Sequence, residues 1–260
     1  MHPDLITQAA REEYTLLKAL KNLFRRTEPI DLSYSRIKTY EFCPLKYKLV
    51  YELGWKEPPM SESCLGLSLH RALEQFHKTQ SRTMEDLIGY LDEYWVNDGY
   101  ERFEDAYESH QRARRMLERY FSNWQKEKNT IVFLEKKFSF NIGAYRLQGT
   151  IDRVDKTPEG EYEIVDYKTK VHDTPRKQAG FNLQLGIYYL ACERLLAKSP
   201  KLTIYCLETG QKITYSFEDS DKKVLLDLLK ETALKIGEKN YYPNRNKCND
   251  CGFKARCQKN

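Results

Sequence analysis

The sequence lacks any apolar run approaching the roughly eighteen residues that a membrane-spanning helix needs. Its start, Met1-His2-Pro3-Asp4, also lacks the basic flank followed by an apolar stretch that marks a secretory signal. These absences argue against a membrane-embedded or exported protein. We therefore expect a cytoplasmic protein in a reducing compartment, with no membrane partner.

A strong excess of charge of one sign is also missing. The chain of 260 residues has 43 Lys and Arg against 38 Asp and Glu, a formal charge of only +5. Net charge alone therefore does not establish a nucleic-acid partner. With 40% hydrophobic and 31% charged residues, and with no internal repeat or low-complexity tract, the composition indicates a globular protein with a sizeable core.

The order of predicted elements suggests an N-terminal helical extension over residues 1–30 and a globular domain over residues 31–260. A short helix is expected after Ser33 and leads to Cys43. A helical subdomain follows at about 61–130, where no proline occurs and apolar residues recur at helical spacing. The core at about 131–240 is expected to contain strands at 131–141, 145–155, 162–169, 202–207 and 213–217, and helices at 182–197 and 222–239.

Two of these strands carry a pattern of acidic residues typical of metal-dependent chemistry. If they form a hairpin with its turn centred near Glu159, Asp152 lies opposite Asp166, with Cβ atoms about 4.5–5.5 Å apart. Lys168 shares the face of Asp166, because side chains alternate along a strand. Two carboxylates suit Mg²⁺ or Mn²⁺, whose water could attack a phosphodiester while Lys168 stabilises the developing charge.

The alternative for this pattern is an ordinary charged strand end, because Asp-x-Lys is a common tripeptide. The apolar residues Ile164 and Val165 lead directly into Asp166, which favours a buried strand that carries charge into a cleft. From the residues alone, the catalytic and the surface interpretations both stay open.

Four motifs in a fixed order resemble those of the RecB-like nucleases in the PD-(D/E)XK superfamily. Together they span residues 31 to about 257, which makes them far more specific than any one alone. They are SYSRI at 33–37 with Tyr40-x-x-Cys43-Pro44, GLSLH at 66–70, GTIDRVD at 149–155 followed by IVDYKT at 164–169, and QLGIY at 184–188.

This resemblance implies an α/β fold: a restriction-endonuclease-like mixed sheet flanked by helices, with a helical insertion and a C-terminal cysteine segment. It also implies roles for individual residues. These are metal ligation by Asp152, Asp166, His70 and the carbonyl of Tyr167, catalysis by Lys168, and site support or DNA binding by Gln184 and Tyr188. His70 could instead be a packed histidine, and His77, on a similar helical face, is a possible confounder. Glu135 and Asp155 are weaker candidates for the site.

The cysteines form a second candidate site. An odd number, seven, argues for metal or cluster ligation over disulfides in a reducing compartment. Cys248, Cys251 and Cys257 are closely spaced, and Cys43 is the candidate fourth ligand, for either Zn²⁺ or a [4Fe–4S] cluster. Resemblance to the cluster-bearing branch, which includes AddB-type subunits and CRISPR-associated RecB-like exonucleases, favours [4Fe–4S]. The remaining cysteines, with apolar neighbours, are expected in the core: Cys64, Cys192 and Cys206.

The expected function is hydrolysis of DNA phosphodiesters with Mg²⁺ or Mn²⁺, as an exonuclease on single strands or DNA ends. The resemblance suggests DNA repair, recombination or CRISPR adaptation, with a possible helicase or integrase-type partner. Arg112, Arg115 and Arg119 share a helical face that could contact phosphates, although interspersed acidic residues also fit a solvated helix. The alternative is a non-catalytic DNA-binding or assembly module of the same fold, with zinc in place of the cluster.

Overall fold

A computed structural model of the chain describes residues 28–79, 82–171, 182–215 and 217–257. The helix expected over residues 1 to about 28 falls outside this part of the chain. The strands are β1 (Ile30–Leu32), β2 (Thr130–Ile142), β3 (Tyr145–Lys156), β4 (Tyr162–Lys168), β5 (Lys201–Cys206) and β6 (Gln211–Tyr215). The helices are α2 (Tyr34–Phe42), α3 (Pro44–Tyr47), the π-helix η1 (Lys48–Glu52), α4 (Ser61–Lys78), α5 (Met84–Glu93), α6 (Phe103–Trp124), α7 (Leu183–Leu196), α8 (Asp219–Gly237), the 3₁₀-helix η2 (Arg245–Asp250) and α9 (Lys254–Cys257).

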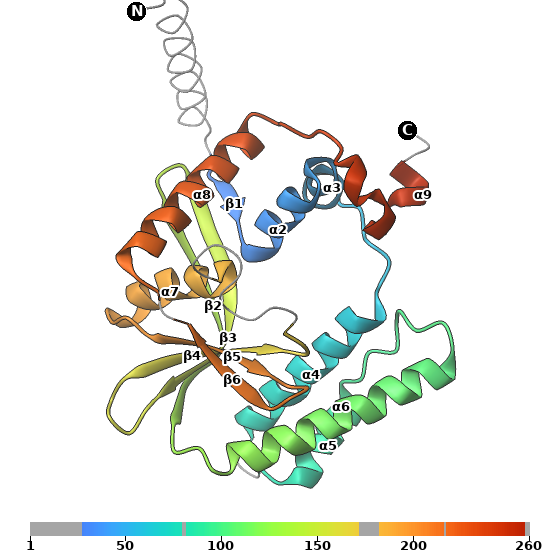
Figure 1. Cartoon of the computed structure of the whole chain (residues 1–260), viewed down its shortest axis with the longest axis vertical. Coiled ribbons are helices and arrows are strands. Elements are labelled where there is room, and N and C mark those ends of the chain that lie inside the picture. The colour runs from blue at the N-terminus through green and yellow to red at the C-terminus, as the bar shows by residue number, and fades with distance from the viewer. Residues whose placement is uncertain (1–27, 80–81, 172–181, 216, 258–260) are drawn as a thin grey trace, which may run out of the picture. The chain divides into compact units, whose positions relative to one another are not determined.

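The strands form one mixed six-stranded sheet in the order β1-β3-β4-β5-β6, with β2 paired to β3 (Figure 1). Strand β3 runs antiparallel to β4, and β5 antiparallel to β6, as hairpin neighbours do. Strand β4 runs parallel to β5, so the chain must cross over between them, and α7 lies in that crossover. The expected mixed α/β fold with flanking helices is confirmed.

The β3–β4 hairpin has the register that the sequence predicted. Arg153 pairs with Val165, and each following pair moves one residue toward the turn. The turn closes where the Gly160 amide donates to the Thr157 carbonyl at 2.9 Å. Gly160 has φ +87°, a conformation that residues with a Cβ rarely adopt. Continued by one position beyond the first pair, this register sets Asp152 opposite Asp166.

The chain divides into two compact units. One contains residues 1–57, 138–149 and 223–260, and the other contains residues 58–137 and 150–222. All the candidate residues of the carboxylate site fall in the second unit, and Cys43 and the three C-terminal cysteines fall in the first. The two candidate sites therefore belong to different units, and each is described within its own.

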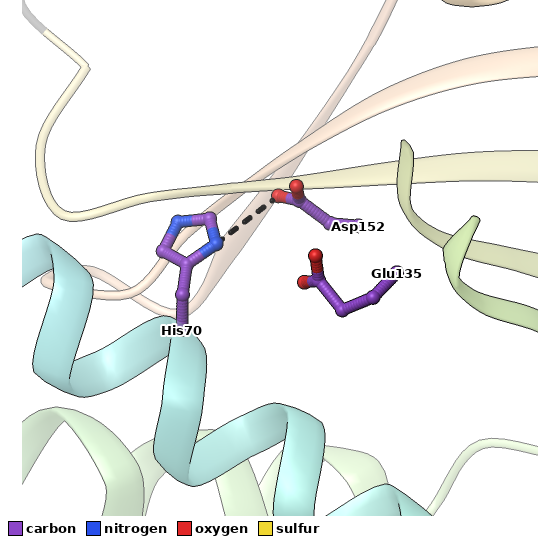
Figure 2. Close-up of side chains that lie close together, drawn as sticks. All are labelled: His70, Glu135 and Asp152. Carbon is purple, nitrogen blue, oxygen red and sulfur yellow. Dashed lines mark ion pairs between the residues drawn. The ribbon is translucent and has the colours of Figure 1, made fainter. Parts of the chain in front are cut away.

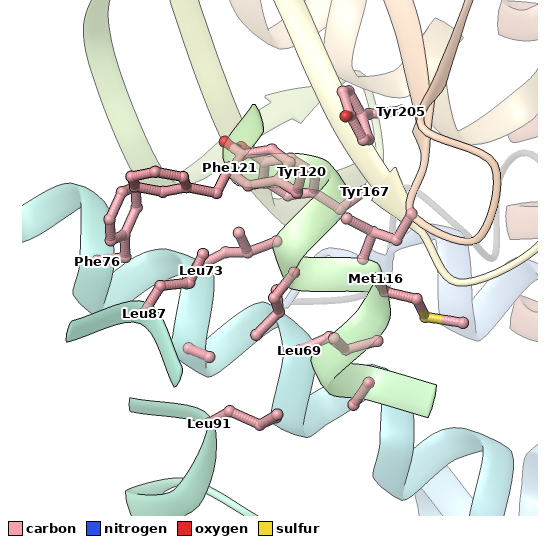
Figure 3. Close-up of a cluster of buried hydrophobic side chains, with 14 of the residues drawn as sticks. Leu69, Leu73, Phe76, Leu87, Leu91, Met116, Tyr120, Phe121, Tyr167 and Tyr205 are labelled. Atoms are coloured by element: carbon pink, nitrogen blue, oxygen red, sulfur yellow. The ribbon is translucent and has the colours of Figure 1, made fainter. Parts of the chain in front are cut away.

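A buried apolar cluster fills the space between α4, α5 and α6 and one face of the β4–β5 pair (Figure 3). Leu69 and Leu73 of α4 are fully buried in it, at the helical spacing seen in the sequence. Val165 and Tyr167 reach the same cluster from β4. Because side chains alternate along a strand, Asp166 and Lys168 must point to the opposite face.

Of the helices in the described part of the chain, none has the length and hydropathy that a membrane-spanning segment needs.

Helix α2 begins as predicted at a hydroxyl cap. The Ser33 Oγ accepts a hydrogen bond from the Arg36 amide at 3.2 Å, which satisfies one of the free amides of the first turn. The helix ends at Phe42, so Cys43 lies at the junction with α3, whose first residue is Pro44. Cys43 has an extended backbone, so it ends α2 and stands immediately before α3 without belonging to either helix.

Candidate active site and cysteine cluster

Asp152 and Asp166 are both buried, with 7% and 1% of their surfaces exposed. The Tyr167 amide donates a hydrogen bond to Asp152 Oδ2 at 3.0 Å, which ties the carboxylate on β3 to the backbone of β4. Lys168 Nζ lies 2.7 Å from Asp166 Oδ2. The hairpin thus brings together the two carboxylates and the ammonium that the sequence placed on one face.

A histidine and a glutamate complete a compact group around Asp152. One ligand atom from each of His70, Glu135 and Asp152 lies within 4.8 Å of the other two. The three side chains converge from α4, β2 and β3 (Figure 2). His70 Nδ1 lies 3.5 Å from Asp152 Oδ2, and His70 Nε2 lies 3.0 Å from the Tyr167 carbonyl oxygen. A nitrogen and two carboxylate oxygens at this spacing could hold a divalent cation.

The carboxylate of Asp166 is not a member of this compact group. Its Oδ2 atom pairs with Lys168, and its Oδ1 atom has no hydrogen-bond partner among the described residues. Burial raises the pKa of Asp166 above its usual range, Lys168 opposes that shift, and Asp152 adds to it. A buried carboxylate oxygen without a donor is uncommon in folded proteins, and it fits a site that receives a cation.

Glu135, a weaker candidate in the sequence, lies in the compact group with His70 and Asp152. It lies within β2 but has φ 45°, in the left-handed region that non-glycine residues seldom adopt. Burial raises the pKa of Glu135 to about 7, with a further contribution from Asp152. The sequence shows only that residue 135 is acidic, and its proximity to Asp152 became visible in the structure.

Gln184 and Tyr188 occupy one face of α7, as their spacing predicted. Asn182 caps this helix, and Gln184 Nε2 donates to the Tyr188 hydroxyl at 2.8 Å. Tyr188 is buried, with 5% of its surface exposed. Burial raises the pKa of Tyr188, and the nearby charges of Asp166 and Asp152 raise it further. The pair therefore lies within electrostatic reach of both carboxylates.

His77 and Asp155 lie apart from the candidate ligands. His77 is buried, and its Nε2 lies 2.5 Å from the Tyr120 hydroxyl. Asp155 is fully buried and accepts two hydrogen bonds from Arg153, at 2.6 and 2.5 Å. Both residues belong to a polar network inside the core. His77 is therefore a packed histidine, and Asp155 is paired with the buried Arg153.

The basic face of α6 is partly occupied by ion pairs. Arg112 pairs with Glu62 at 2.9 Å and with Glu208 at 3.2 Å. Arg119 donates to the carbonyl of Glu208. These contacts join α6 to neighbouring segments. Arg112 and Arg119, two of the three arginines, therefore have partners within the protein and do not need DNA to explain their positions.

Four cysteines gather in the other unit around one small cavity of about 40 Å³. The Asn244 amide donates a hydrogen bond to Cys43 Sγ at 3.3 Å. Burial raises the pKa of Cys257, and the neighbouring thiols raise it further. All four cysteines line the cavity: Cys43, Cys248, Cys251 and Cys257.

Hydrogen bonds from distant parts of the chain hold this arrangement together. The Leu45 amide donates to the Tyr242 carbonyl at 3.2 Å, and Asn244 Nδ2 donates to the Phe42 carbonyl at 3.0 Å. The segment after α8 is thereby held against the segment around Cys43. The other cysteines are buried elsewhere, in agreement with their expected core positions: Cys64, Cys192 and Cys206.

Comparison with known proteins identifies the family. Residues 31–258 match the PD-(D/E)XK nuclease superfamily. The chain is 31% identical over 230 residues to a subunit of the ATP-dependent helicase/deoxyribonuclease of Carboxydothermus hydrogenoformans, covering 72% of this chain and 21% of that protein. It is 27% identical over 194 residues to the subunit of the same name from Streptococcus agalactiae, covering 66% and 17%. The chain thus spans about a fifth of the length of these relatives.

The fold is also similar to that of a solved structure, described as a "Putative exonuclease" from Eubacterium rectale. The TM-score is 0.51 with 12% sequence identity, over 82% of this chain and 83% of that one. At this identity the similarity concerns the fold alone. The family match covers nearly the whole described chain, including every residue of both candidate sites. The chain therefore belongs to the PD-(D/E)XK nuclease superfamily.

Proposed function

We propose that this chain hydrolyses DNA phosphodiester bonds with Mg²⁺ or Mn²⁺ and acts as an exonuclease on single strands or DNA ends. One observation carries the proposal: His70, Glu135 and Asp152 converge beside a buried Asp166 that is paired with Lys168. A surface charge pattern would not bury two carboxylates next to each other, because each raises the energetic cost of ionising the other.

The donor set fits a hard divalent cation. Asp152 and Glu135 supply carboxylate oxygens, His70 supplies Nδ1, and Asp166 has a buried oxygen without a hydrogen-bond donor among the described residues. When bound, Mg²⁺ or Mn²⁺ would polarise a phosphate oxygen and lower the pKa of a water. The Tyr167 carbonyl oxygen lies 3.0 Å from His70 Nε2, so it orients the histidine ring. The same carbonyl is the remaining candidate metal ligand on β4.

Lys168 has two roles in this proposal. Its ammonium, 2.7 Å from Asp166, favours the ionised form of that buried carboxylate. Its charge would also stabilise the negative charge that develops on a phosphate during attack. Gln184 and Tyr188, joined by their hydrogen bond near both carboxylates, would hold the DNA backbone or support the carboxylates.

For the cysteines we propose a [4Fe–4S] cluster bound by Cys43, Cys248, Cys251 and Cys257. Four thiolates can hold either Zn²⁺ or a [4Fe–4S] cluster. The gathering of all four around one cavity supports a shared centre, and the resemblance of their spacing to the cluster-bearing RecB-like nucleases favours the cluster. The amide donor on Cys43 Sγ also suits a cluster thiolate.

The proposed partners are DNA and a helicase-type protein. The relatives matched by this chain are named as subunits of an ATP-dependent helicase/deoxyribonuclease, and the chain spans only about a fifth of them. This supports a role in DNA repair or recombination with a helicase over a role in CRISPR adaptation with an integrase-type protein. We propose an intracellular location, because the proposed substrate is DNA.

Cleavage of end-labelled DNA tests the proposal. Purified protein is incubated with single- and double-stranded DNA, with Mg²⁺, with Mn²⁺ or with chelator, beside the Lys168→Ala variant. Progressive loss of end nucleotides that needs metal and Lys168 is the expected result. Binding of DNA without metal-dependent cleavage would instead support the alternative, a non-catalytic binding module of the same fold.

A further inference from the structure

A buried guanidinium lies on the face of the hairpin opposite the carboxylates. Arg153 follows Asp152 on β3, so its side chain points to the face that α4 and α6 cover. Only 2% of its surface is exposed, although arginine is among the residues least often buried. A charge in this position needs an explanation other than apolar packing.

Each of the five N–H donors of Arg153 has an acceptor. Nε and Nη2 donate to the two oxygens of Asp155, at 2.6 and 2.5 Å. Nη2 also donates to Glu127 at 2.8 Å, and Nη1 donates to the hydroxyls of Tyr120 and Tyr167, at 2.9 and 3.2 Å. A planar guanidinium satisfied at every donor has one orientation, and a lysine could not reproduce this fork.

Tyr167 links this network to the carboxylate site. Its hydroxyl lies 2.9 Å from that of Tyr120 and accepts from Arg153. Its own backbone faces the candidate ligands: its amide donates to Asp152 and its carbonyl contacts His70, each at 3.0 Å. One residue therefore connects the buried network on one face with two candidate metal ligands at the other.

Helix α4 meets the same system at two places two turns apart. His70 contacts the Tyr167 carbonyl, and His77 Nε2 lies 2.5 Å from the Tyr120 hydroxyl, which also contacts Tyr167. The position of His70 relative to Asp152 thus depends on how Tyr167 and Tyr120 are held. Of the residues to which Arg153 donates, Tyr167 is the one whose backbone contacts Asp152 and His70, so the connection runs through Tyr167.

We propose that Arg153 is a positioning residue for the metal site: by fixing the Tyr167 and Tyr120 hydroxyls, it sets the Tyr167 backbone against Asp152 and His70. The inference rests on the proposed function, because it assigns a metal to Asp152 and His70. It predicts that a hydroxyl on the far face of the hairpin controls metal affinity without touching metal or DNA. Partners of this kind often change metal affinity by about 10–100-fold.

The test compares two tyrosines that share one cluster. Tyr167→Phe removes a hydroxyl from the network, whereas Tyr205→Phe removes a hydroxyl bonded instead to Asn123 at 3.0 Å. Both side chains are buried to a similar degree, 3% and 2% exposed. Mn²⁺ binding is measured by calorimetry and by the electron paramagnetic resonance spectrum of the bound ion, with unfolding temperature as a measure of stability.

We expect Tyr167→Phe to weaken Mn²⁺ binding about tenfold and to change the spectrum of the bound ion, with the KM for DNA unchanged. Tyr205→Phe should bind Mn²⁺ like the wild-type protein even if its unfolding temperature falls. Arg153→Lys should weaken Mn²⁺ binding at least as much as Tyr167→Phe. Wild-type Mn²⁺ affinity and spectrum in Tyr167→Phe would overturn the proposal, whether or not Arg153→Lys folds.

The result also separates this inference from the proposed nuclease activity. If the wild-type protein binds Mn²⁺ through Asp152 but does not cut DNA, and Tyr167→Phe still weakens binding, the positioning role stands and the nuclease proposal fails. If the protein cuts DNA and Tyr167→Phe matches Tyr205→Phe in every measurement, the nuclease proposal stands and the positioning role fails. Absence of Mn²⁺ binding by the wild-type protein would overturn both.

Discussion

The ammonium nitrogen of Lys168 lies 2.7 Å from Oδ2 of Asp166, two residues earlier on the same face of β4. Asp166 is almost fully buried, and a buried carboxylate is costly to keep ionised. Lys168 offsets that cost, as its opposing effect on the raised pKa of Asp166 indicates. This pairing lowers the cost of a charged carboxylate at a buried position of the strand.

Removal of the lysine ammonium should therefore abolish cleavage. Lys168→Ala is expected to reduce the rate by at least about 10²-fold, because the charge that stabilises the transition state is lost. Asp152→Ala and Asp166→Ala should be equally inactive because they remove candidate ligands. Rates on end-labelled DNA and binding of DNA in the presence of chelator measure the two effects separately.

Lys170→Ala is the matched control, since Lys170 is two residues further along and lies 3.9 Å from Glu208. It should cut at close to the wild-type rate. Wild-type cleavage by Lys168→Ala would show that the assigned site is wrong.

Two histidines on one helix should respond differently to substitution. His70→Ala should raise the Mn²⁺ concentration needed for cleavage, because it removes a nitrogen beside Asp152. His77→Ala should lower the unfolding temperature instead, because it removes a buried partner of the Tyr120 hydroxyl in the core. Titration of activity with Mn²⁺ and thermal unfolding of each variant test the contrast, and equal small effects of both on the metal requirement would return His70 to the class of packed histidines.

Loss of one charge at Glu135 should weaken the metal site. Glu135→Gln keeps the size of the side chain but removes a charged oxygen from the group formed with His70 and Asp152. Mn²⁺ affinity should fall about tenfold or more. Glu231→Gln, which alters a carboxylate paired with Lys235 on α8, is the control. The assignment of Glu135 does not survive if both variants bind Mn²⁺ like the wild-type protein.

Replacement of any of the four cysteines of the proposed cluster should bleach the protein. With one thiolate missing, iron content and the absorbance near about 400 nm should both fall, and stability should drop, because the C-terminal segment loses its attachment at Cys43. Cys64→Ser should keep full iron and have only a local packing cost of about 1–3 kcal/mol. The same holds for the other two core cysteines, Cys192 and Cys206. Full iron and sulfide in Cys43→Ala would contradict the assignment, and mild chelation should stop cleavage without bleaching.

His77 should make stability depend on pH. Burial, and the charges of Arg153 and Arg82, lower the pKa of His77 to about 2 from 6.5. The unfolded chain then binds a proton below pH 6.5 that the folded chain does not bind, so the free energy of unfolding falls as the pH falls toward 2. The slope from His77 is about 1.4 kcal/mol per pH unit. Denaturant unfolding between pH 7 and about pH 4 should show a shallower decline for His77→Gln than for the wild-type protein, and an equal decline in both would contradict this role of His77.

The alternating apolar pattern, the turn at 157–160 and the positions of Asp152, Asp166 and Lys168 were enough to predict the hairpin and its register. The reason is local: side chains alternate every residue in a strand, so a turn of known centre determines which residues face each other. The helix of Gln184 and Tyr188 and the helical character of residues 61–130 followed in the same way from helical spacing, but the division of that region into α4, α5 and α6 did not. Close spacing likewise grouped Cys248, Cys251 and Cys257.

Tertiary structure decided several contacts between distant residues that neither periodicity nor the resemblance predicted. Glu135 lies close to Asp152 and has a left-handed backbone within β2, and no periodic pattern in the sequence encodes such a break. The separation of His70 from His77 likewise depends on which neighbours each meets two turns apart on α4: a backbone carbonyl and a carboxylate for one, a buried hydroxyl for the other. Arg153 is one letter of the GTIDRVD motif in the sequence, and only the structure shows that it is buried with all five donors satisfied. Local periodicity specifies the faces of strands and helices, whereas contacts between residues far apart in the chain depend on packing that the sequence does not display.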